Sequence, residues 1–259
     1  MKIAVAGKGG VGKTLVAGVL AEFLSSRGFT VLAIDADPSP NLALTLGIPA
    51  EEANKIVPIS ENTPLIESKT QTGVPGVYNL SFTVEDIVDQ FSVKTPFGVN
   101  LLVMGTVPYA GGGCMCPANT VIRALLHHLI VKRKEAVIMD MEAGVEHMGR
   151  ATAEHVDTML IVTDSSAKSM ETAKKLQALA KELGIKKRLL IGNKVKNTEE
   201  SRLIEDFVHK IGLPFLGFIP YDEHVLQADM KGETPLKNAE KSKAVAAIRR
   251  MGEKLLETK

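Results

Sequence analysis

The stretch that most constrains this chain is residues 7–14, Gly-Lys-Gly-Gly-Val-Gly-Lys-Thr, which matches the pattern G-x-x-x-x-G-K-T. An apolar run at residues 3–6 leads into it, and the apolar spacing over residues 16–24 predicts a helix after it. Strand, glycine-rich loop and helix in this order form a phosphate-binding loop, because backbone N–H groups and the helix N-terminus then converge on one anion. A glycine-rich turn with an incidental lysine is the weaker alternative in this setting.

The residues of this loop have different expected tasks. Lys13 can reach the β- and γ-phosphates, and the Thr14 hydroxyl can ligate Mg²⁺. Glycines let the backbone curl with its N–H groups pointing at the anion. The predicted phosphate-binding set is Gly9, Gly10, Val11, Gly12, Lys13, Thr14 and Leu15.

Composition excludes several other classes of protein. The net charge of +1 gives no electrostatic reason to bind nucleic acid or an acidic membrane surface. No apolar run approaches the roughly 20 residues of a membrane span, and the first strand begins at Met1-Lys2 without a signal peptide. We therefore expect a cytoplasmic protein with no nucleic-acid partner and no stable membrane association, in which the two cysteines are reduced.

Apolar runs alternate with helical patterns of 10–15 residues along the chain. The predicted strands are 2–6, 30–34, 99–104, 136–139, 158–162, 189–191 and 214–219, and the predicted helices are 12–27, 120–132, 169–183, 199–211 and 241–256. This order predicts a doubly wound, mostly parallel α/β sheet in a single domain over residues 1–259. Residues 48–98 contain five prolines and are predicted to form an irregular insertion without a core of its own.

Two aspartates follow predicted strands and so belong to the same sheet edge as the phosphate loop. Asp140 ends an apolar run like a Walker B strand, where its carboxylate would hold Mg²⁺ directly or through water. Gly144, four residues on, can present its N–H to a γ-phosphate. Asp37 follows the second strand. The alternative for each aspartate is a helix cap.

A cysteine pair lies in the loop at residues 111–117, Gly-Gly-Gly-Cys-Met-Cys-Pro. In an extended segment Cys114 and Cys116 point the same way and can present two thiolates to one ion. Thiolates suit zinc, iron–sulfur clusters, Cu(I) or nickel. A tetrahedral thiolate site needs four ligands and the chain has two cysteines, so two copies would have to share the ion. A redox disulfide and a pair of buried cysteines remain as alternatives.

The segment Lys-Gly-Gly-Val-Gly-Lys-Thr resembles the deviant Walker A motif of the MinD/ParA/nitrogenase-iron-protein family of dimeric ATPases, which are P-loop NTPases of the SIMIBI class. The resemblance implies that Lys8 crosses a dimer interface to the partner's nucleotide. It also implies that Asp37, which precedes Pro38, orients the attacking water and contributes to the Mg²⁺ site. The implied catalytic residues are thus Lys8, Lys13 and Asp37. Leu15 replaces a hydroxyl residue of many relatives, so its side chain makes no α-phosphate contact.

The same resemblance implies a pocket for the base late in the chain. Asn193-Lys194 looks like the Asn-Lys pair of this family and of related GTPases, in which asparagine contacts the base. Lys196 stands where the GTPases carry a guanine-reading aspartate, so adenine is favoured and the nucleotides are ATP and ADP. The implied second wall of the pocket is Pro220, Tyr221 and Asp222.

Cys-Met-Cys-Pro and residues 139–147 resemble, more closely, the nickel-insertion ATPases that mature carbon monoxide dehydrogenase (CooC-type) and acetyl-CoA synthase (AcsF-type). The likeness covers nearly the whole chain. It implies a homodimer that binds Ni²⁺, or Zn²⁺ in its place, through two Cys114/Cys116 pairs. ATP hydrolysis would then deliver the metal to an apo carbon monoxide dehydrogenase or an apo acetyl-CoA synthase.

Two other functions remain open on the sequence. A MinD/ParA-like spatial organiser would use the terminal helix, whose apolar face is Val245, Ile248, Met251 and Leu255, although such a face more often packs on the sheet. An iron–sulfur carrier or reductase would hold a cluster between two copies. His147 is the histidine best placed to act as a switch residue; the other five are expected to be surface or packing residues.

Overall fold

One sheet runs through the part of the chain that the computed structural model describes, residues 1–37, 40–73, 77–79, 81–105, 117–132, 135–142 and 150–257. Its strands are β1 (Lys2–Gly7), β2 (Val31–Ala36), β3 (Val93–Lys94), β4 (Asn100–Val103), β5 (Ala136–Met141), β6 (Thr158–Thr163), β7 (Lys187–Val195) and β8 (Phe215–Pro220). The spatial order is β3-β4-β2-β5-β1-β6-β7-β8, and every pairing is parallel except that of β3 with β4. The predicted doubly wound, mostly parallel sheet is confirmed.

The apolar composition of the central strands explains why they lie in the middle of the sheet. All six positions of β1, of β5 and of β6 are buried, as expected for parallel strands covered on both faces. Two charged residues lie in these strands, Asp140 of β5 and Lys2 of β1. The Lys2 Nζ donates to the carbonyls of Leu129 (3.0 Å) and Glu135 (3.1 Å). Because β1 pairs with β5 on one side and β6 on the other, the loop that follows it begins in the middle of the sheet edge.

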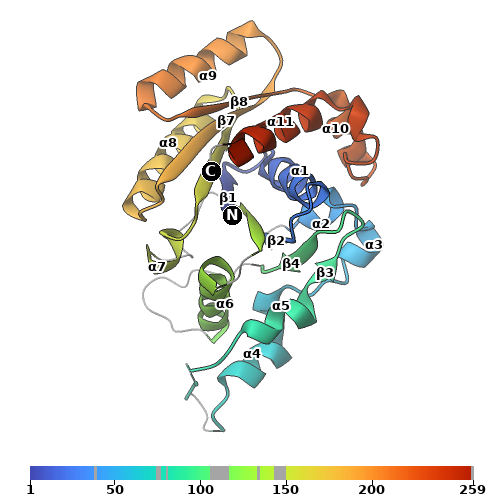
Figure 1. Cartoon of the computed structure of the whole chain (residues 1–259), viewed down its shortest axis with the longest axis vertical. Coiled ribbons are helices and arrows are strands. Elements are labelled where there is room, and N and C mark those ends of the chain that lie inside the picture. The colour runs from blue at the N-terminus through green and yellow to red at the C-terminus, as the bar shows by residue number, and fades with distance from the viewer. Residues whose placement is uncertain are drawn as a thin grey trace.

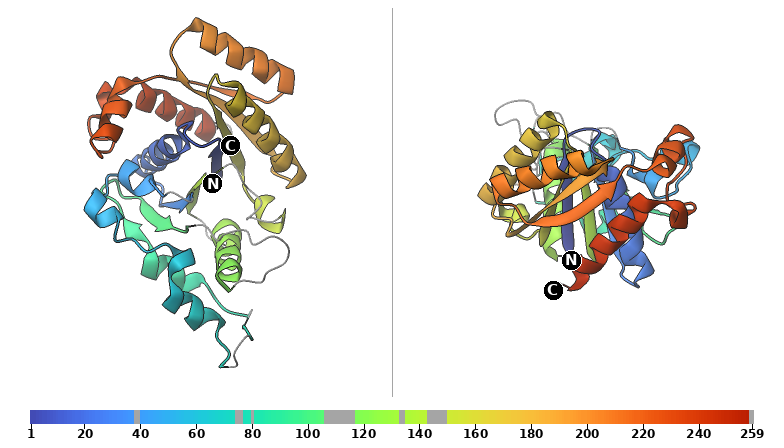
Figure 2. Two further views of the ribbon diagram at one scale, coloured as in Figure 1. Left: turned by 180° about the vertical axis from the view of Figure 1, so that it is seen from behind. Right: turned by 90° about the horizontal axis from the view of Figure 1, so that it is seen from above.

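Helices cover both faces of the sheet (Figure 1, Figure 2). One apolar cluster joins the sheet to α1 (Lys13–Ser26), α2 (Leu42–Thr45) and α11 (Lys243–Glu257). The cluster on the other face includes residues of α6 (Pro117–His127), α8 (Ala167–Glu182) and α9 (Thr198–Ile211). The smaller elements are α3 (Ala50–Ala53), η1 (Ile59–Glu61), α4 (Thr63–Thr70), α5 (Glu85–Phe91), η2 (His128–Lys132), α7 (Arg150–Ala153), α10 (Glu223–Met230) and η4 (Ala239–Lys241).

Three local predictions need correction. Strand β7 continues to Val195, so Asn193 and Lys194 lie inside the strand rather than after it, because pairing with β8 extends as far as Val195 opposite Pro220. The helix predicted over 120–132 is α-helical only to His127 and then widens into a π-helix. Helix α10 was missed because eight residues with mixed polarity give little periodic signal.

Residues 61–91 form a projection that we call the arm. Helix α4 begins where the Asn62 side chain accepts a hydrogen bond from the Leu65 N–H (3.1 Å), and a bridge between Gln71 and Tyr78 closes the outer end. Leu65 and Ile87 are buried in the same cluster as α6, so the arm shares the core of the sheet domain. In Figure 1, α4 and α5 lie at one end of the long axis and α9 lies at the other.

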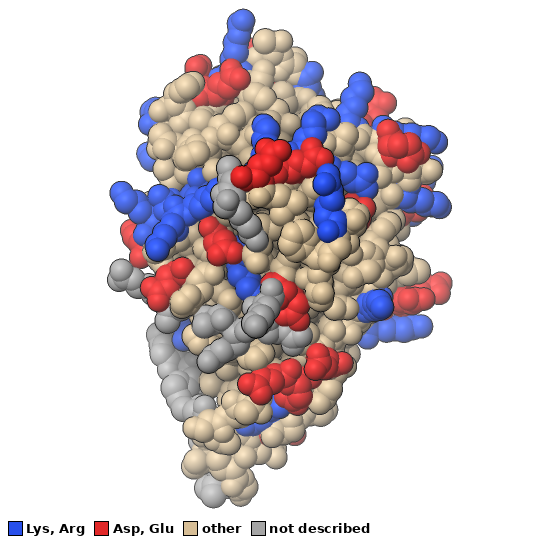
Figure 3. All heavy atoms as spheres, in the orientation of Figure 1, with Lys and Arg blue, Asp and Glu red and all other residues tan. Residues whose placement is uncertain are grey.

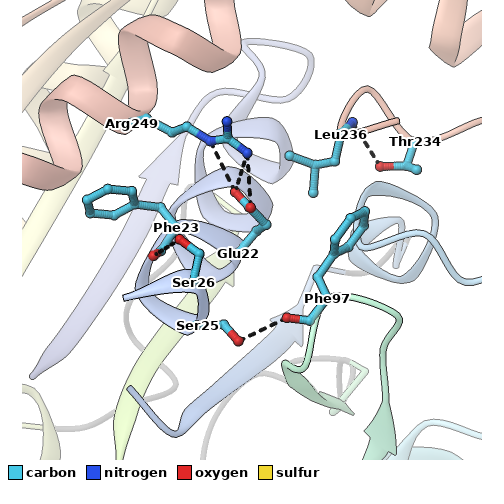
Figure 4. Close-up of polar contacts among 8 residues, drawn as sticks. All are labelled: Glu22, Phe23, Ser25, Ser26, Phe97, Thr234, Leu236 and Arg249. Carbon is cyan, nitrogen blue, oxygen red and sulfur yellow. Dashed lines mark hydrogen bonds and ion pairs between the residues drawn. The ribbon is translucent and has the colours of Figure 1, made fainter. Parts of the chain in front are cut away.

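The apolar face of α11 is packed against the sheet. Val245 and Ile248 are 0% exposed, and Met251 and Leu255 are 4% exposed. An ion pair between Arg249 and Glu22 (Nη2–Oε1, 2.9 Å) fixes α11 on α1 (Figure 4). This face therefore has no surface to offer a membrane or a partner. Within the described residues, no helix combines the length and apolar character that crossing a bilayer requires.

We predict that Ile248→Ala lowers the free energy of unfolding by about 2–4 kcal/mol, because it leaves a cavity between α11 and the sheet. Chemical denaturation followed by circular dichroism measures the change. The exposed neighbour Arg250 provides the control, since Arg250→Ala should change stability by about 0.5 kcal/mol or less. Equal stability of the two variants would contradict the packing of α11.

Candidate functional site

The phosphate loop leaves β1 in a shape that requires glycine. Gly10 (φ 81°) and Gly12 (φ 92°) have left-handed backbones, and the Val11 N–H donates to the Lys8 carbonyl (3.3 Å). A Cβ at position 12 would collide with the Asn193 side-chain amide. The loop then enters α1, so Lys13 and Thr14 stand in its first turn, and the partly buried Leu15 packs on the apolar cluster behind it.

The end of β7 holds this loop from the side. Asn193, which is 3% exposed, donates from Nδ2 to the Val11 carbonyl (2.6 Å), and its Oδ1 accepts the Lys194 N–H (2.8 Å). Lys194 has a left-handed backbone (φ 60°) and donates from Nζ to the Gly10 carbonyl (2.7 Å). Two adjacent residues thus fix two adjacent carbonyls of the loop. The contact of Asn193 with a base remains a prediction. The second hydrogen of the Asn193 side-chain amide is the donor that such a contact would use.

Asp37 lies against the phosphate-loop lysine. The Lys13 Nζ is 3.6 Å from the Asp37 carboxylate, with Lys13 5% exposed and Asp37 20% exposed. The segment carrying Asp37 is held by Asp35, a fully buried residue of β2 that accepts the N–H groups of Asp37 (3.2 Å) and Leu42 (2.9 Å). Burial raises the pKa of Asp35 to about 6, although these N–H donors act to lower it. Sequence reasoning missed this positioning role, for which the repeated aspartate in Asp-x-Asp was the available signal.

Asp140, on β5, also lies near Lys13 and Asp37. It is fully buried, and neither carboxylate oxygen has a hydrogen-bonding partner among the described residues. Burial raises the pKa of Asp140 to about 7; the Thr14 hydroxyl is near enough to offset part of this rise, though not in a geometry that makes a hydrogen bond, while the charge of Asp35 adds to it. Lys13 and Asp37 also act on this pKa, so Lys13, Thr14, Asp37 and Asp140 form one cluster.

This cluster fits Mg²⁺ bound together with a nucleotide. A buried carboxylate with two unused oxygens and a neighbouring hydroxyl are hard oxygen donors of the kind Mg²⁺ prefers. In the described part of the chain, no three His, Cys, Asp or Glu side chains are grouped to hold a metal by themselves. Phosphate oxygens and water would therefore supply the remaining ligands, as is usual for Mg²⁺ in phosphoryl-transfer sites.

The second wall of the predicted base pocket follows β8. Tyr221 is 38% exposed, and the Lys196 ammonium lies 4.9 Å from the centre of its ring. The Asp222 carboxylate accepts hydrogen bonds from the His224 N–H (2.9 Å), the Ser242 hydroxyl (2.7 Å) and the Ala244 N–H (2.9 Å). Partial burial acts to raise the pKa of Asp222, but these donors together lower it. The Asp222 side chain thus fixes the starts of α10 and α11. The base-pocket role of Pro220 and Tyr221 remains a prediction.

Several predicted residues lie outside the described residues: Pro38, Cys114, Cys116, Gly144 and His147. The nearest described residue to the cysteine pair is Pro117, which directly follows Cys116 in the sequence and is the first residue of α6. Lys8 lies in the loop itself and is half-buried. The predicted role of Lys8 in a partner's site concerns a second copy, so it remains a prediction.

A glycine-rich loop between a central parallel strand and a helix, with buried carboxylates at the same sheet edge, defines a P-loop nucleotide-binding protein. The family model described as CobQ/CobB/MinD/ParA nucleotide binding domain matches residues 2–236. The chain therefore belongs to this family, as its resemblance to MinD and ParA predicted, and it is an ATP-binding protein and ATPase of the MinD/ParA type.

Two relatives match most of the chain. An uncharacterized ATP-binding protein of Methanocaldococcus jannaschii is 46% identical over 238 residues, 90% of each chain. The carbon monoxide dehydrogenase accessory protein CooC of Rhodospirillum rubrum is 45% identical over 236 residues, 90% of this chain and 88% of CooC.

Solved structures agree on the fold. A ParA family ATPase from Chlorobium tepidum superimposes with a TM-score of 0.72 at 21% identity, covering 97% of both chains. MinD of Aquifex aeolicus gives a TM-score of 0.69 at 22% identity, covering 99% of this chain and 97% of MinD. At these identities the likeness shows that the chain has the MinD/ParA fold.

We predict that Asp140→Asn stabilises the metal-free protein above pH 7 by about 2–4 kcal/mol, because it removes a buried charge that has no hydrogen-bonding partner among the described residues. The folded protein takes up this proton at about pH 7, whereas a free aspartate does so near 3.8. The wild-type free energy of unfolding should therefore fall as pH rises from about 4 to 7, and the variant should lack that part of the fall. Denaturation in EDTA at several pH values measures the difference.

The control for this series is Asp206→Asn, which changes an exposed carboxylate on α9 and should follow the wild-type curve. With Mg²⁺ and ATP present the order should reverse, since Asp140→Asn loses a metal ligand. Parallel pH curves for wild type and Asp140→Asn would contradict the burial of this charge.

We further predict that Asn193→Ala weakens ATP binding roughly tenfold, because a lost hydrogen bond to the buried Val11 carbonyl costs about 1–2 kcal/mol. Calorimetric titration measures it, with Asn54→Ala, an exposed amide after α3, as the control. Inorganic tripolyphosphate separates the two roles of Asn193. Weaker binding of this ligand as well shows that Asn193 supports the loop, whereas a loss confined to ATP would mean that it acts on the base alone.

Proposed function

We propose that this chain is an ATP-dependent nickel-insertion factor for carbon monoxide dehydrogenase or acetyl-CoA synthase. The observation that carries the proposal is 45% identity to the carbon monoxide dehydrogenase accessory protein CooC over about nine tenths of both chains. A match of that extent leaves only about a tenth of either chain outside it. It supports a shared task as well as a shared fold.

The nucleotide half of the proposed cycle uses residues of the described site. Lys13 and the loop N–H groups would bind the β- and γ-phosphates, and Thr14 and Asp140 would ligate Mg²⁺, which neutralises developing charge on the phosphates. Asp37, 3.6 Å from Lys13, would orient the attacking water. Because Asp35 accepts hydrogen bonds from the N–H groups of both Asp37 and Leu42, loss of the γ-phosphate contacts at Asp37 would be transmitted to the start of α2.

The metal-binding half of the proposed cycle depends on how many sulfur ligands are available to the ion. Nickel is here the cargo, and two thiolates of one chain are too few to enclose it. Two chains meeting face to face would bring four sulfur atoms together and would also let Lys8 reach the partner's nucleotide. Pro117, the first residue of α6, directly follows Cys116 in the sequence, and the N–H groups at the start of a helix would favour the thiolate form of a cysteine beside it. Closure on ATP and separation after hydrolysis would then load and release the ion.

An iron–sulfur carrier or reductase is the second candidate, with one observation in its favour. The iron–sulfur ATP-binding protein of light-independent protochlorophyllide reductase from Halorhodospira halophila is 27% identical over 252 residues, although this chain covers only 76% of it. A brown chromophore after anaerobic purification would favour this candidate. The spatial-organiser alternative is weakened, since the α11 face that it would use is buried.

We predict one Ni²⁺ per two chains in the wild type and none above background in Cys114→Ser. Light scattering with and without Ni²⁺ and ATP, followed by metal analysis of the peaks, measures both quantities. The matched control is Met115→Ala, which changes the residue between the two cysteines and keeps both thiolates. Undiminished nickel in Cys114→Ser would refute the metal assignment, and a protein that stays a single chain under every condition yet still delivers metal would refute the dimer.

A further inference from the structure

The arm differs in charge from the rest of the molecule. Residues 61–91 contain five acidic side chains and one basic one, a net charge of −4, and because the whole chain carries +1 the remainder carries +5. The single basic residue of this range, Lys69, forms an ion pair with Asp86 (Nζ–Oδ1, 2.7 Å). Glu67 and Glu85 are exposed on α4 and α5. Figure 3 shows acidic side chains gathered over these two helices.

Two large apolar side chains stand at the outer end of the arm. Val77 is 52% exposed and Tyr78 is 48% exposed. The backbone there is held in place, since the Asn79 N–H donates to the Thr70 carbonyl (2.7 Å) and the Thr72 hydroxyl donates to the Val77 carbonyl (2.8 Å). A fixed backbone with a projecting tyrosine is typical of an anchor in a protein interface, because the side chain offers a large contact area at low entropic cost.

The arm, together with the residues that lead into it (58–60), contacts the described residues on either side of the cysteine segment. The Ser60 N–H donates to the Met104 carbonyl (3.0 Å), and Gly105 lies so close to Pro58 and Ser60 that a Cβ on it would collide with both. On the other side, η1 and α4 pack on α6, which begins at Pro117. The segment that carries both cysteines lies between residues 105 and 117. The arm contacts the residue range on one side of that segment through α4 and α6, and the residues that lead into the arm, Pro58 and Ser60, contact Met104 and Gly105 on the other side.

We propose that the arm is the docking surface for the apoenzyme that receives the metal, and that this partner presents a basic face with an apolar pocket for Tyr78. The inference rests on the proposed function. The acidic helices α4 and α5 would speed association with a basic surface, while Val77 and Tyr78 would slow dissociation. Because α4 packs on α6, which begins directly after the cysteine segment, a partner docked on the arm would lie nearer to the described ends of that segment than to α9.

The test measures binding of the dimeric, Ni²⁺- and ATP-loaded protein to immobilised apo carbon monoxide dehydrogenase from the same organism, by biolayer interferometry at low and high salt. The arm variants are Glu67→Lys/Glu85→Lys and Tyr78→Ala. Their matched controls lie on α9, Glu205→Lys/Asp206→Lys for charge and Leu203→Ala for exposed apolar area. Nickel content and ATP hydrolysis of each variant alone are measured in parallel.

The expected result is a Kd at least roughly tenfold weaker for each arm variant, with slower association and a smaller salt dependence for the charge reversal and faster dissociation for Tyr78→Ala. The α9 variants should bind like the wild type, and nickel content and ATP hydrolysis should not change in any variant. Arm variants that bind like the wild type, or α9 variants that weaken equally, would overturn the arm as docking surface and leave the proposed function standing. A wild type that does not bind either apoenzyme, with apo acetyl-CoA synthase tested in the same way, would overturn both.

Discussion

The phosphate loop depends on the support that β7 gives it. Glycines make its left-handed turns possible, but they also leave the loop with few side chains of its own to keep its shape. The Asn193 amide and the Lys194 ammonium, from a strand about 180 residues later, bind the carbonyls of Val11 and Gly10. With those carbonyls directed toward β7, the N–H groups of the loop are left to face the phosphates, and a flexible sequence becomes a fixed anion site.

A second constraint is the concentration of buried charge beside the loop. Asp35 and Asp140 are both fully buried, and burial raises the pKa of each, to about 6 and about 7. Asp35 has backbone donors and orders the segment of Asp37, whereas Asp140 has no hydrogen-bonding partner among the described residues. One carboxylate is thus used to hold the fold, whereas both oxygens of the other are available for the predicted Mg²⁺. A cation bound there would recover the free energy that burying the Asp140 charge costs.

The arm gives the molecule a second functional end. Its helices share the core of the α6 face, so packing fixes its position relative to α6, which begins directly after the cysteine segment in the sequence. Its net charge is opposite in sign to that of the rest of the chain, and Val77 and Tyr78 are exposed at its outer end. Nucleotide chemistry at the sheet edge, metal transfer at the cysteine segment and recognition at the arm would then be separate tasks on one rigid framework.

The sequence by itself determined the fold class, the phosphate loop and the strand-end aspartates, because these depend on local patterns: runs of apolar residues, glycine spacing and a charge that follows a buried strand. It could not assign Asp222 to the caps of α10 and α11, place Asn193 and Lys194 inside β7 against the phosphate loop, or find the positioning role of Asp35. Those facts depend on which distant segments meet, since a hydrogen bond across 182 residues leaves no periodic trace in the chain. Tertiary structure also decided that the apolar face of α11 is core, because the same spacing of Val245 and Ile248 suits a packed helix and a membrane-binding one equally.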